Sequence, residues 1–256
     1  MTVFHSIILG IIEGLTEFLP ISSTGHMVLF SHFLHIPDSA TLSTFLIVVQ
    51  IGAIAAVAVL YFKKLLEIKM IQKLIVGFIP TGVIGLFVFP HIKQWLANPL
   101  LVAITMLLGG ILILIIESWY EKKETGKEII DTHIISYKQA FMLGLYQAIA
   151  VIPGISRSGA MIMGGLTMKL PRKILTEFTF LLAVPTMAAA TLYALYKGRH
   201  DLALGSLTPL ILGTVVAFIV ALYVIRFFLT YIRSHSFKIF GWYRIVVGII
   251  LIFILF

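Results

Sequence analysis

Cysteine is absent from this chain of 256 residues, and charged residues make up only 12% of it. Without cysteine the chain has no disulfide, no thiolate metal site and no cysteine nucleophile. Soluble domains carry about 25% charged residues, so this chain has too few to cover a water-facing surface. With 60% hydrophobic residues, intrinsic disorder is excluded as well. The composition therefore indicates an integral membrane protein.

Six apolar runs are long enough to span a bilayer, which takes about 20 residues. Two other apolar regions, 3–35 and 137–170, are interrupted by Pro, Ser and Gly at residues 19–25 and 152–159. Irregular backbone at membrane depth is tolerated only inside protein or along a cavity. We therefore interpret both regions as re-entrant helical hairpins. The six predicted spans are 42–62, 74–90, 99–116, 175–196, 207–229 and 239–256.

The two interrupted regions match each other without gaps at an offset of 134 residues. Gly10 aligns with Gly144, and Ser22 aligns with Ser156. Each half then holds one hairpin and three spans, and because three is odd the halves are inverted. The prediction is an all-α integral membrane protein with an inverted-topology repeat, six transmembrane helices and two re-entrant helical hairpins. Within a single membrane domain, 1–256, repeat one is 1–118, a cytoplasmic linker loop is 119–136, and repeat two is 137–256.

The net charge of +8 is distributed unevenly over this topology. Of the 19 Lys and Arg residues, fourteen fall on one side, while Lys93, Lys197 and Arg199 fall on the other. Arg157 and Arg244 lie within the membrane. An excess of Lys and Arg marks the cytoplasmic side, so both termini are expected outside. Membrane topology and attraction to anionic lipids explain the net positive charge. No nucleic-acid partner is expected.

Glu13 and Glu17 are two carboxylates in apolar surroundings. Spaced four residues apart, they share one face of a helix, and they repel each other unless a cation or a proton lies between them. The pair can hold a divalent ion through oxygen ligands, or one member can act as a general acid or base. The alternative is a pair of interfacial carboxylates on a short amphipathic helix.

Ser22, Ser23 and Thr24 follow Pro20 at an expected helix start. Simple N-capping explains Ser22 equally well, because serine and threonine are good caps. His26 lies about one turn after Ser23, so the hydroxyl and the imidazole can meet. A hydroxyl beside an imidazole is the arrangement of an activated nucleophile, although a lone histidine on an apolar helix is often structural.

Residues 153–159 of the second interruption read Pro-Gly-Ile-Ser-Arg-Ser-Gly. Small residues such as Gly154 and Ser158 let the backbone approach a ligand closely. Ser156 is expected to cap a helix whose first N–H groups form an anion site. The planar guanidinium of Arg157 suits bidentate phosphate contacts. This segment is therefore a candidate phosphate-binding loop.

An inverted repeat brings its interrupted helices together near the midplane. Glu13 and Glu17 are then expected to face Arg157 and the helix-end amides near Ser156. A carboxylate-held metal opposite a phosphate-binding loop suits phosphoryl transfer, and at this depth the substrate must be a lipid phosphate or diphosphate. The alternative is that Arg157 only pairs with one of the carboxylates for structural reasons.

Two segments, Glu13 to His26 and Pro153 to Gly159, resemble the signature motifs of undecaprenyl-diphosphate phosphatases of the bacitracin-resistance type. The likeness extends over nearly the whole chain, including residues 180–185. Two positions depart from the family pattern. Met161 stands where the family commonly has threonine, and Leu46 stands where relatives often have an acidic residue.

The resemblance implies hydrolysis of undecaprenyl diphosphate to undecaprenyl phosphate and inorganic phosphate. It also implies a Mg²⁺ or Ca²⁺ requirement, a bacterial plasma membrane, recycling of the carrier lipid for peptidoglycan synthesis, and resistance to bacitracin. The functional positions of the family fall on Glu13, Glu17, Ser22, Ser23, His26, Ser156 and Arg157.

The mechanism that we expect has the diphosphate entering from the outer leaflet, where membrane lipids surround the site. Ser23, or a water in its place, attacks the terminal phosphorus, and His26 transfers the proton as base or as acid. Glu13 and Glu17 are the expected metal ligands and share in catalysis. The expected diphosphate-binding residues are Arg157, Ser156, Ser22, Gly154 and Ser158.

Other classes of function stay open at this point. A transporter or flippase of undecaprenyl phosphate, alone or combined with phosphatase activity, also uses inverted repeats. A structural membrane protein whose buried charges only pair with one another is a third reading. The sequence leaves the oligomeric state open, a homodimer included.

Overall fold

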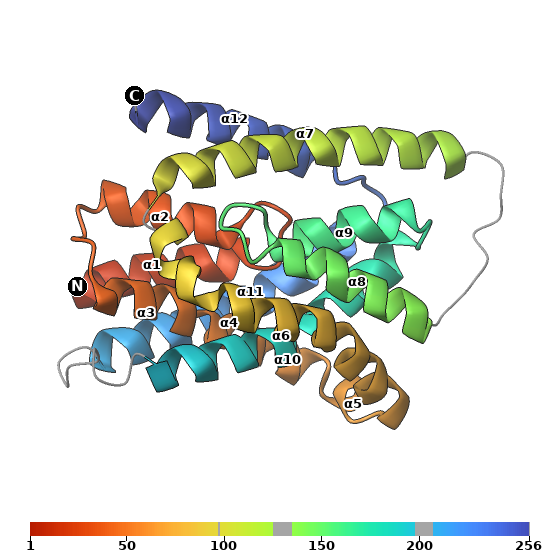
Figure 1. The fold of residues 1–256 in the computed structure, drawn as a ribbon, viewed down its shortest axis with the longest axis horizontal. Coiled ribbons are helices and arrows are strands. Elements are labelled where there is room, and N and C mark those ends of the chain that lie inside the picture. The colour runs from red at the N-terminus through yellow and green to blue at the C-terminus, as the bar shows by residue number, and fades with distance from the viewer. Residues whose placement is uncertain (97, 125–134, 198–206, 256) are drawn as a thin grey trace.

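Helices are the regular elements of the described part of the chain, which covers residues 1–96, 98–124, 135–197 and 207–255 of a computed structural model (Figure 1). The predicted all-α architecture is therefore confirmed for these residues. The helices are α1 (Val3–Thr16), α2 (Ser23–Phe33), α3 (Ala40–Val48), α4 (Gln50–Leu60), α5 (Phe62–Leu65), α6 (Ile68–Leu96), α7 (Pro99–Glu124), α8 (Tyr137–Ile149), α9 (Arg157–Thr167), α10 (Arg172–Lys197), α11 (Leu207–Tyr231) and α12 (Lys238–Leu255).

Five helical segments in the described residues are long and apolar enough to cross a membrane, and each coincides with a predicted span. The sixth predicted span, 239–256, falls on α12, which is not among the five; its last residue lies outside the described part. The chain is therefore a multi-pass membrane protein. The five segments are Thr41–Leu60, Ile68–Val88, Pro99–Lys122, Arg172–Lys197 and Leu207–Tyr231.

Large apolar side chains also cover much of the outside of the helices. Phe87 in α6, Phe227 in α11 and Phe253 in α12 are 79%, 67% and 81% exposed. In water, apolar exposure costs about 25 cal/mol per Å², whereas lipid removes this cost. The outside of the molecule is therefore built for a bilayer.

The two interrupted regions form helical hairpins whose bends meet. Helices α1 and α2 are joined by residues 17–22, and α8 and α9 by residues 150–156. Figure 1 shows the two hairpins reaching inward from opposite ends of the molecule, with the two bends near its centre. The two segments that interrupt the helices in the sequence therefore lie together between the two halves of the molecule.

The same backbone conformation recurs at the two matched caps. Ser22 and Ser156 have φ angles of 70° and 72°, which is the left-handed region. Their side chains accept hydrogen bonds from the backbone N–H groups of Gly25 and Gly159, at 3.2 and 3.1 Å. A non-glycine residue with positive φ costs of order 1–3 kcal/mol and is concentrated at functional sites. Both bends therefore carry strained, serine-capped helix starts.

Close glycine contacts seat each hairpin on a long helix of the other half. A Cβ on Gly10 would lie 2.4 Å from the carbonyl oxygen of Gly213 in α11. A Cβ on Gly144 would lie 2.0 Å from the carbonyl oxygen of Gly77 in α6. The aligned pair Gly10 and Gly144 thus makes equivalent contacts, as an inverted repeat requires, while the repeat bounds 1–118 and 137–256 stay a prediction.

Helices α7 and α12 pack along one side of the molecule (Figure 1). Helix α7 continues to Glu124, into the range predicted as the linker 119–136, and residues 125–134 of that linker lie outside the described part. The N-terminus and the end of α12 lie at the same end of the molecule (Figure 1). Arg199, one of the three basic residues expected on that side, also lies outside the described residues.

Candidate active site

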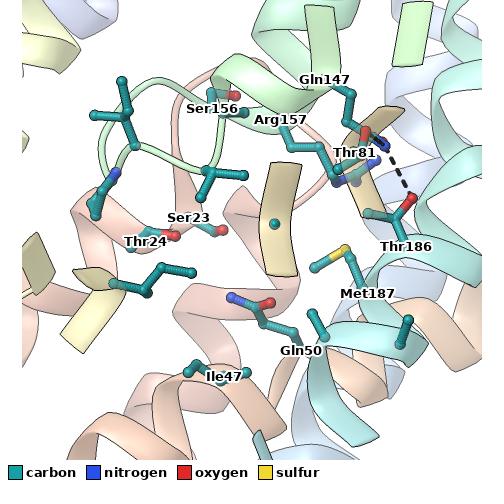
Figure 2. A pocket seen from close by; sticks show the side chains of 18 of the residues that line it. Ser23, Thr24, Ile47, Gln50, Thr81, Gln147, Ser156, Arg157, Thr186 and Met187 are labelled. Carbon is teal, nitrogen blue, oxygen red and sulfur yellow. Dashed lines mark hydrogen bonds between the residues drawn. The ribbon is translucent and has the colours of Figure 1, made fainter. Parts of the chain in front are cut away.

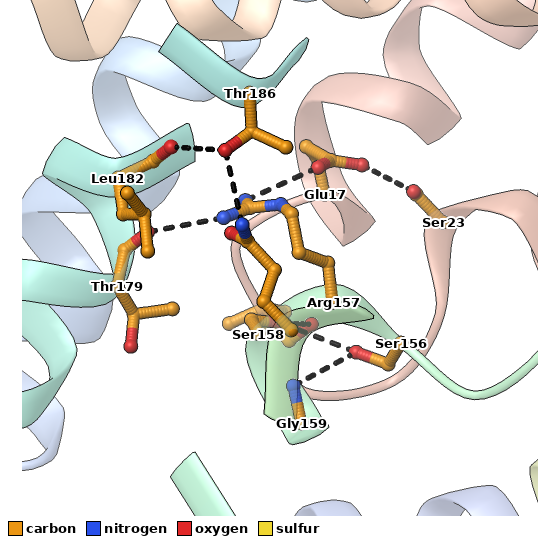
Figure 3. Close-up of polar contacts among 11 residues, drawn as sticks. Glu17, Ser23, Ser156, Arg157, Ser158, Gly159, Thr179, Leu182 and Thr186 are labelled. Carbon is orange, nitrogen blue, oxygen red and sulfur yellow. Dashed lines mark hydrogen bonds and ion pairs between the residues drawn. The ribbon is translucent and has the colours of Figure 1, made fainter. Parts of the chain in front are cut away.

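An ion pair joins the two bends. The guanidinium Nη2 of Arg157 lies 3.3 Å from Oε1 of Glu17, and its Nη1 donates a hydrogen bond of 3.0 Å to the carbonyl oxygen of Thr179 in α10 (Figure 3). The hydroxyl of Ser23 donates to the other oxygen of Glu17. The predicted convergence of the carboxylate segment and the Ser-Arg-Ser segment is therefore present.

Glu17 and Arg157 are largely shielded from the outside of the molecule. Their side chains are 4% and 11% exposed. Removing one partner of a buried ion pair costs about 3–5 kcal/mol because the other charge is left without compensation. The pair fixes the relative position of the two bends as well as providing charge.

Glu13 lies one helical turn before Glu17 and is fully buried. Both of its carboxylate oxygens lack a hydrogen-bond partner among the described residues. A buried carboxylate without a partner is costly, and either a divalent cation or a proton removes that cost. Mg²⁺ is commonly held by one or two carboxylates together with substrate phosphates and waters. Glu13 with Glu17 fits such a site, although the described residues contain no cluster of three or more metal-binding side chains.

His26 does not form the predicted pair with Ser23. Its Nδ1 lies 2.8 Å from the carbonyl oxygen of Ser22, and its Nε2 lies 2.8 Å from the hydroxyl of Tyr243 in α12. The rings of His26 and Tyr243 are stacked, with centroids 5.6 Å apart. Both imidazole nitrogens therefore have partners other than Ser23, whose hydroxyl is taken by Glu17. The spacing of one turn allowed a contact between Ser23 and His26, but Glu17 binds the hydroxyl of Ser23, and Ser22 and Tyr243 bind the imidazole of His26.

Ser158 and Gly154 have packing roles that the sequence did not reveal. The hydroxyl of Ser158 is fully buried and donates a hydrogen bond of 2.9 Å to the carbonyl of Leu19 in the first bend. Gly154 has a φ of 89°, and a Cβ there would lie 2.0 Å from the hydroxyl oxygen of Thr105 in α7. Ser158 thus ties the bends together, and Gly154 lets the second bend lie against α7.

A cavity of about 500 Å³ opens beside the two bends (Figure 2). Most of its polar wall comes from both bends and helix starts, and Thr81, Gln147 and Thr186 add to it (Figure 2). The residues from the bends and helix starts are Glu17, Ser22, Ser23, Thr24, Gly154, Ser156 and Arg157. The remaining walls are mostly apolar side chains of the second halves of α6 and α10 and the junction of α3 and α4. These halves run toward the end of the molecule that holds both termini (Figure 1). A ligand with a charged head group and an apolar tail matches this division of the cavity into a polar wall and apolar walls.

The two departures from the family pattern lie in different surroundings. Leu46 lines the cavity together with Gln50, so an apolar side chain stands in its wall where relatives often have an acid. Met161 is fully buried in α9 and packs in the main hydrophobic core. Only the first departure touches the cavity.

Three further polar residues near the site were not assigned from the sequence. The amide Nε2 of Gln147 in α8 donates to the hydroxyls of Thr81 and Thr186, at 2.9 and 3.0 Å (Figure 2). Gln147 aligns with Glu13 in the repeat, which is a signal that could have pointed to it. Tyr243 carries no such signal. Arg244 was visible only as a charge at membrane depth.

Comparison with known proteins gives a consistent result over nearly the entire chain. The family description "Bacitracin resistance protein BacA" matches residues 6–250. The chain is 46% identical over 250 residues to the undecaprenyl-diphosphatase of a Sulfurihydrogenibium species, covering 98% of each chain. It is 47% identical over 256 residues to that of Wolinella succinogenes, covering 100% of this chain and 99% of the other. It is 44% identical over 252 residues to that of Aquifex aeolicus, covering 98% and 97%.

Proposed function

Because the chain belongs to the bacitracin resistance protein BacA family, we propose that it is an undecaprenyl-diphosphatase. It hydrolyses undecaprenyl diphosphate to undecaprenyl phosphate and inorganic phosphate. The reaction recycles the carrier lipid of peptidoglycan synthesis and confers resistance to bacitracin. The observation that carries the proposal is the contact series from Ser23 through Glu17 to Arg157 at the polar end of an apolar cavity.

The cavity suits a lipid diphosphate. Arg157 and the amides at the start of α9 offer positive charge to the phosphates, because a guanidinium binds phosphate bidentately and helix N-termini attract anions. Ser22 and Ser156 place the first turns of α2 and α9 beside the same space. The apolar walls receive the isoprenoid chain, whose burial is favourable.

Glu17 is the group placed to take a proton from Ser23. Ser23 Oγ bonds to the terminal phosphorus while its proton passes to Glu17, and the bond from that phosphorus to the bridging oxygen breaks. Undecaprenyl phosphate leaves, and water then hydrolyses the phosphoserine to inorganic phosphate. In the alternative, Glu17 and Ser23 orient a water that attacks directly. General base catalysis of either kind contributes about 10²–10⁴-fold.

His26 acts in this proposal as a support for the helix start that carries Ser23. The carbonyl of Ser22 can only accept, so Nδ1 of His26 carries the proton in that bond and Nε2 accepts from Tyr243. Neither nitrogen is directed at Ser23. The expected role of His26 in proton transfer is therefore replaced by Glu17.

Glu13 and Glu17 would hold the divalent cation, Mg²⁺ or Ca²⁺. When bound, the ion supplies stabilisation of negative charge on the phosphoryl oxygens. The free oxygens of Glu13 support this assignment.

The membrane arrangement that we propose is six transmembrane helices, two re-entrant hairpins and inverted halves. Both termini lie outside the cytoplasm, and the cavity opens toward the outer leaflet. The excess of basic residues at the opposite end and the direction of the cavity support this orientation. The oligomeric state, a homodimer included, stays open.

Buried aromatic rings close the interior on one side of the bends. Phe18 follows Glu17 directly and contacts Phe180, with ring centroids 4.9 Å apart. The series continues through Phe228 to Phe237, at 6.0 and 6.3 Å, and all four side chains are fully buried. These rings fill the interior on the side of the bends away from the termini. A transporter with alternating access is also closed on one side in each conformation, so lipid translocation in vesicles is the measurement that separates the two functions.

The test is phosphate release from undecaprenyl diphosphate by purified protein in detergent, with Mg²⁺, with Ca²⁺ and with EDTA. We expect release with at least one cation, loss in EDTA, and loss in Arg157→Ala. Arg226→Ala, at an exposed position in α11, is the matched control and should keep activity. No release under any condition, together with lipid translocation in vesicles, would assign the protein to transport instead.

A further inference from the structure

Arg244 lies in the middle of α12 with its side chain completely buried. Two consecutive glycines of α7 make room for it. A Cβ on Gly109 would lie 2.1 Å from Nη2 of Arg244, and one on Gly110 would lie 2.9 Å from its Cβ. The interface between α7 and α12 is therefore shaped around this guanidinium.

All five N–H groups of the Arg244 guanidinium have carbonyl partners. Nε donates to Met106 at 3.2 Å, Nη1 to Ile155 at 2.9 Å and Pro20 at 3.3 Å, and Nη2 to Gly154 at 2.9 Å and Thr105 at 3.2 Å. A guanidinium has five N–H donors in a fixed planar fork. One rigid group thus holds both bends, through residues 20 and 154–155, against α7.

The position of these carbonyls explains what the contacts control. The trans peptide that carries the Ile155 carbonyl also carries the N–H of Ser156, pointing to the opposite side. Fixing that carbonyl therefore fixes the direction of the first amide of the strained cap before Arg157. The contact at Pro20 fixes the first bend two residues before the strained cap at Ser22.

Arg244 has no carboxylate partner in the part of the chain that the structure describes. Its charge is met only by carbonyl dipoles, and a buried charge without a counter-ion is costly. A tie between the bends that served stability alone could use neutral donors, as Ser158 does with Leu19. The charged fork is suited to a junction that must hold several carbonyls in one geometry.

We propose that Arg244 is a positioning residue for the phosphatase reaction. It sets the first bend, with Glu17 and Ser23, in register with the second bend, with Arg157. The inference rests on the proposed function. Errors of about 1 Å in the placement of reacting groups cost about 10²-fold in rate, so loss of this register acts mainly on kcat.

The test compares Arg244→Lys and Gly109→Ala with wild type and with Arg226→Lys as the matched control. Lysine keeps the charge but has only three donors on one nitrogen, so it cannot bind all five carbonyls. Gly109→Ala keeps Arg244 and displaces its Nη2. Activity is measured per folded, monodisperse molecule at a temperature well below the melting temperature of every variant.

We expect kcat to fall about 10- to 100-fold in both variants, with a smaller change in KM, and no change in Arg226→Lys. A purely structural role predicts lower melting temperatures with wild-type kcat per folded molecule, and that result would overturn the proposal. A purely electrostatic role predicts rescue by lysine, which would also overturn it. Should Arg244→Lys fail to fold, Gly109→Ala decides between the same outcomes.

The failure of the proposed function is recognised separately. Wild-type protein that releases no phosphate removes the phosphatase assignment and this inference with it. Active wild-type protein together with fully active Arg244→Lys and Gly109→Ala removes the role of Arg244 alone.

Discussion

Replacing Ser23 by alanine separates the two forms of the proposed mechanism. The Ser23 hydroxyl donates to the charged Glu17, and a hydrogen bond to a charged group is worth about 1.5–3 kcal/mol. If Ser23 only helps to orient an attacking water, Ser23→Ala loses at most this energy. At 1.36 kcal/mol per decade, that corresponds to a fall of about 10- to 150-fold in kcat.

A serine nucleophile predicts a much larger effect. Removing a nucleophilic serine from another hydrolase costs roughly 10⁶-fold in kcat. We expect Ser23→Ala to fall by more than about 10³-fold, beyond what the hydrogen bond alone explains. The measurement is phosphate release under steady-state and single-turnover conditions, with thermal melting to confirm folding.

Ser31→Ala is the matched control for this experiment. Ser31 lies in the same helix α2, is buried, and its hydroxyl donates only to the carbonyl of Met27 at 2.8 Å. We expect it to keep kcat near wild type. Turnover by Ser23→Ala within about 150-fold of wild type would refute Ser23 as nucleophile and leave water in that role. Phosphate label recovered on Ser23 after acid quenching would support the covalent path.

Three other substitutions test separate parts of the site and fold. Glu13→Gln should raise the Mg²⁺ concentration for half-maximal activity by at least about tenfold, because even loss of a hydrogen-bond partner of a metal ligand changes metal affinity about 10–100-fold. An unchanged Mg²⁺ titration contradicts Glu13 as a ligand. Tyr243→Phe keeps the stacked ring and removes one hydrogen bond to His26, so a fall in kcat below about tenfold is expected, and a fall above 10²-fold indicates a proton path through His26. Gly10→Ala should lower the free energy of unfolding by about 1–3 kcal/mol because its Cβ meets a carbonyl of α11 at 2.4 Å. Gly85→Ala is its control, with nothing within 4 Å, and equal melting temperatures would count against the packing argument.

The breaks and the repeat could be read from the sequence because they depend on local chemistry. The first bend holds Pro20 and the second holds Pro153 and Gly154; proline removes a helical hydrogen bond and glycine is a poor helix former. Proline alone is not enough, because Pro80 and Pro185 lie inside α6 and α10, so the clusters with serine and glycine marked the breaks. The matched offset of 134 residues placed Ser22 and Ser156 at equivalent points, and their φ angles agree within 2°. The meeting of Glu17 with Arg157 followed from the inverted arrangement.

Side-chain partners could not be read in the same way. Spacing along a helix allowed Ser23 to meet His26, but the hydrogen bond of Ser23 went to Glu17, and Nε2 of His26 found Tyr243, 217 residues away. Such choices depend on the register of α12 against the bends, which no local pattern encodes. Arg244 was visible as an isolated charge, and its five carbonyl partners come from three separate segments.

The long reach of Arg244 has a consequence for how the protein is made. Its contacts to Pro20 and Gly154 span 224 and 90 residues, and contacts of such separation form late because a long loop must close first. Chains grow from the N-terminus, so both bends are synthesised and inserted before α12 exists. Helices α1 to α11 can be in place while the bends still lack their common anchor. A nascent or prematurely terminated chain without α12 is therefore expected to be helical, membrane-inserted and inactive, which keeps incomplete copies from acting on the lipid around them.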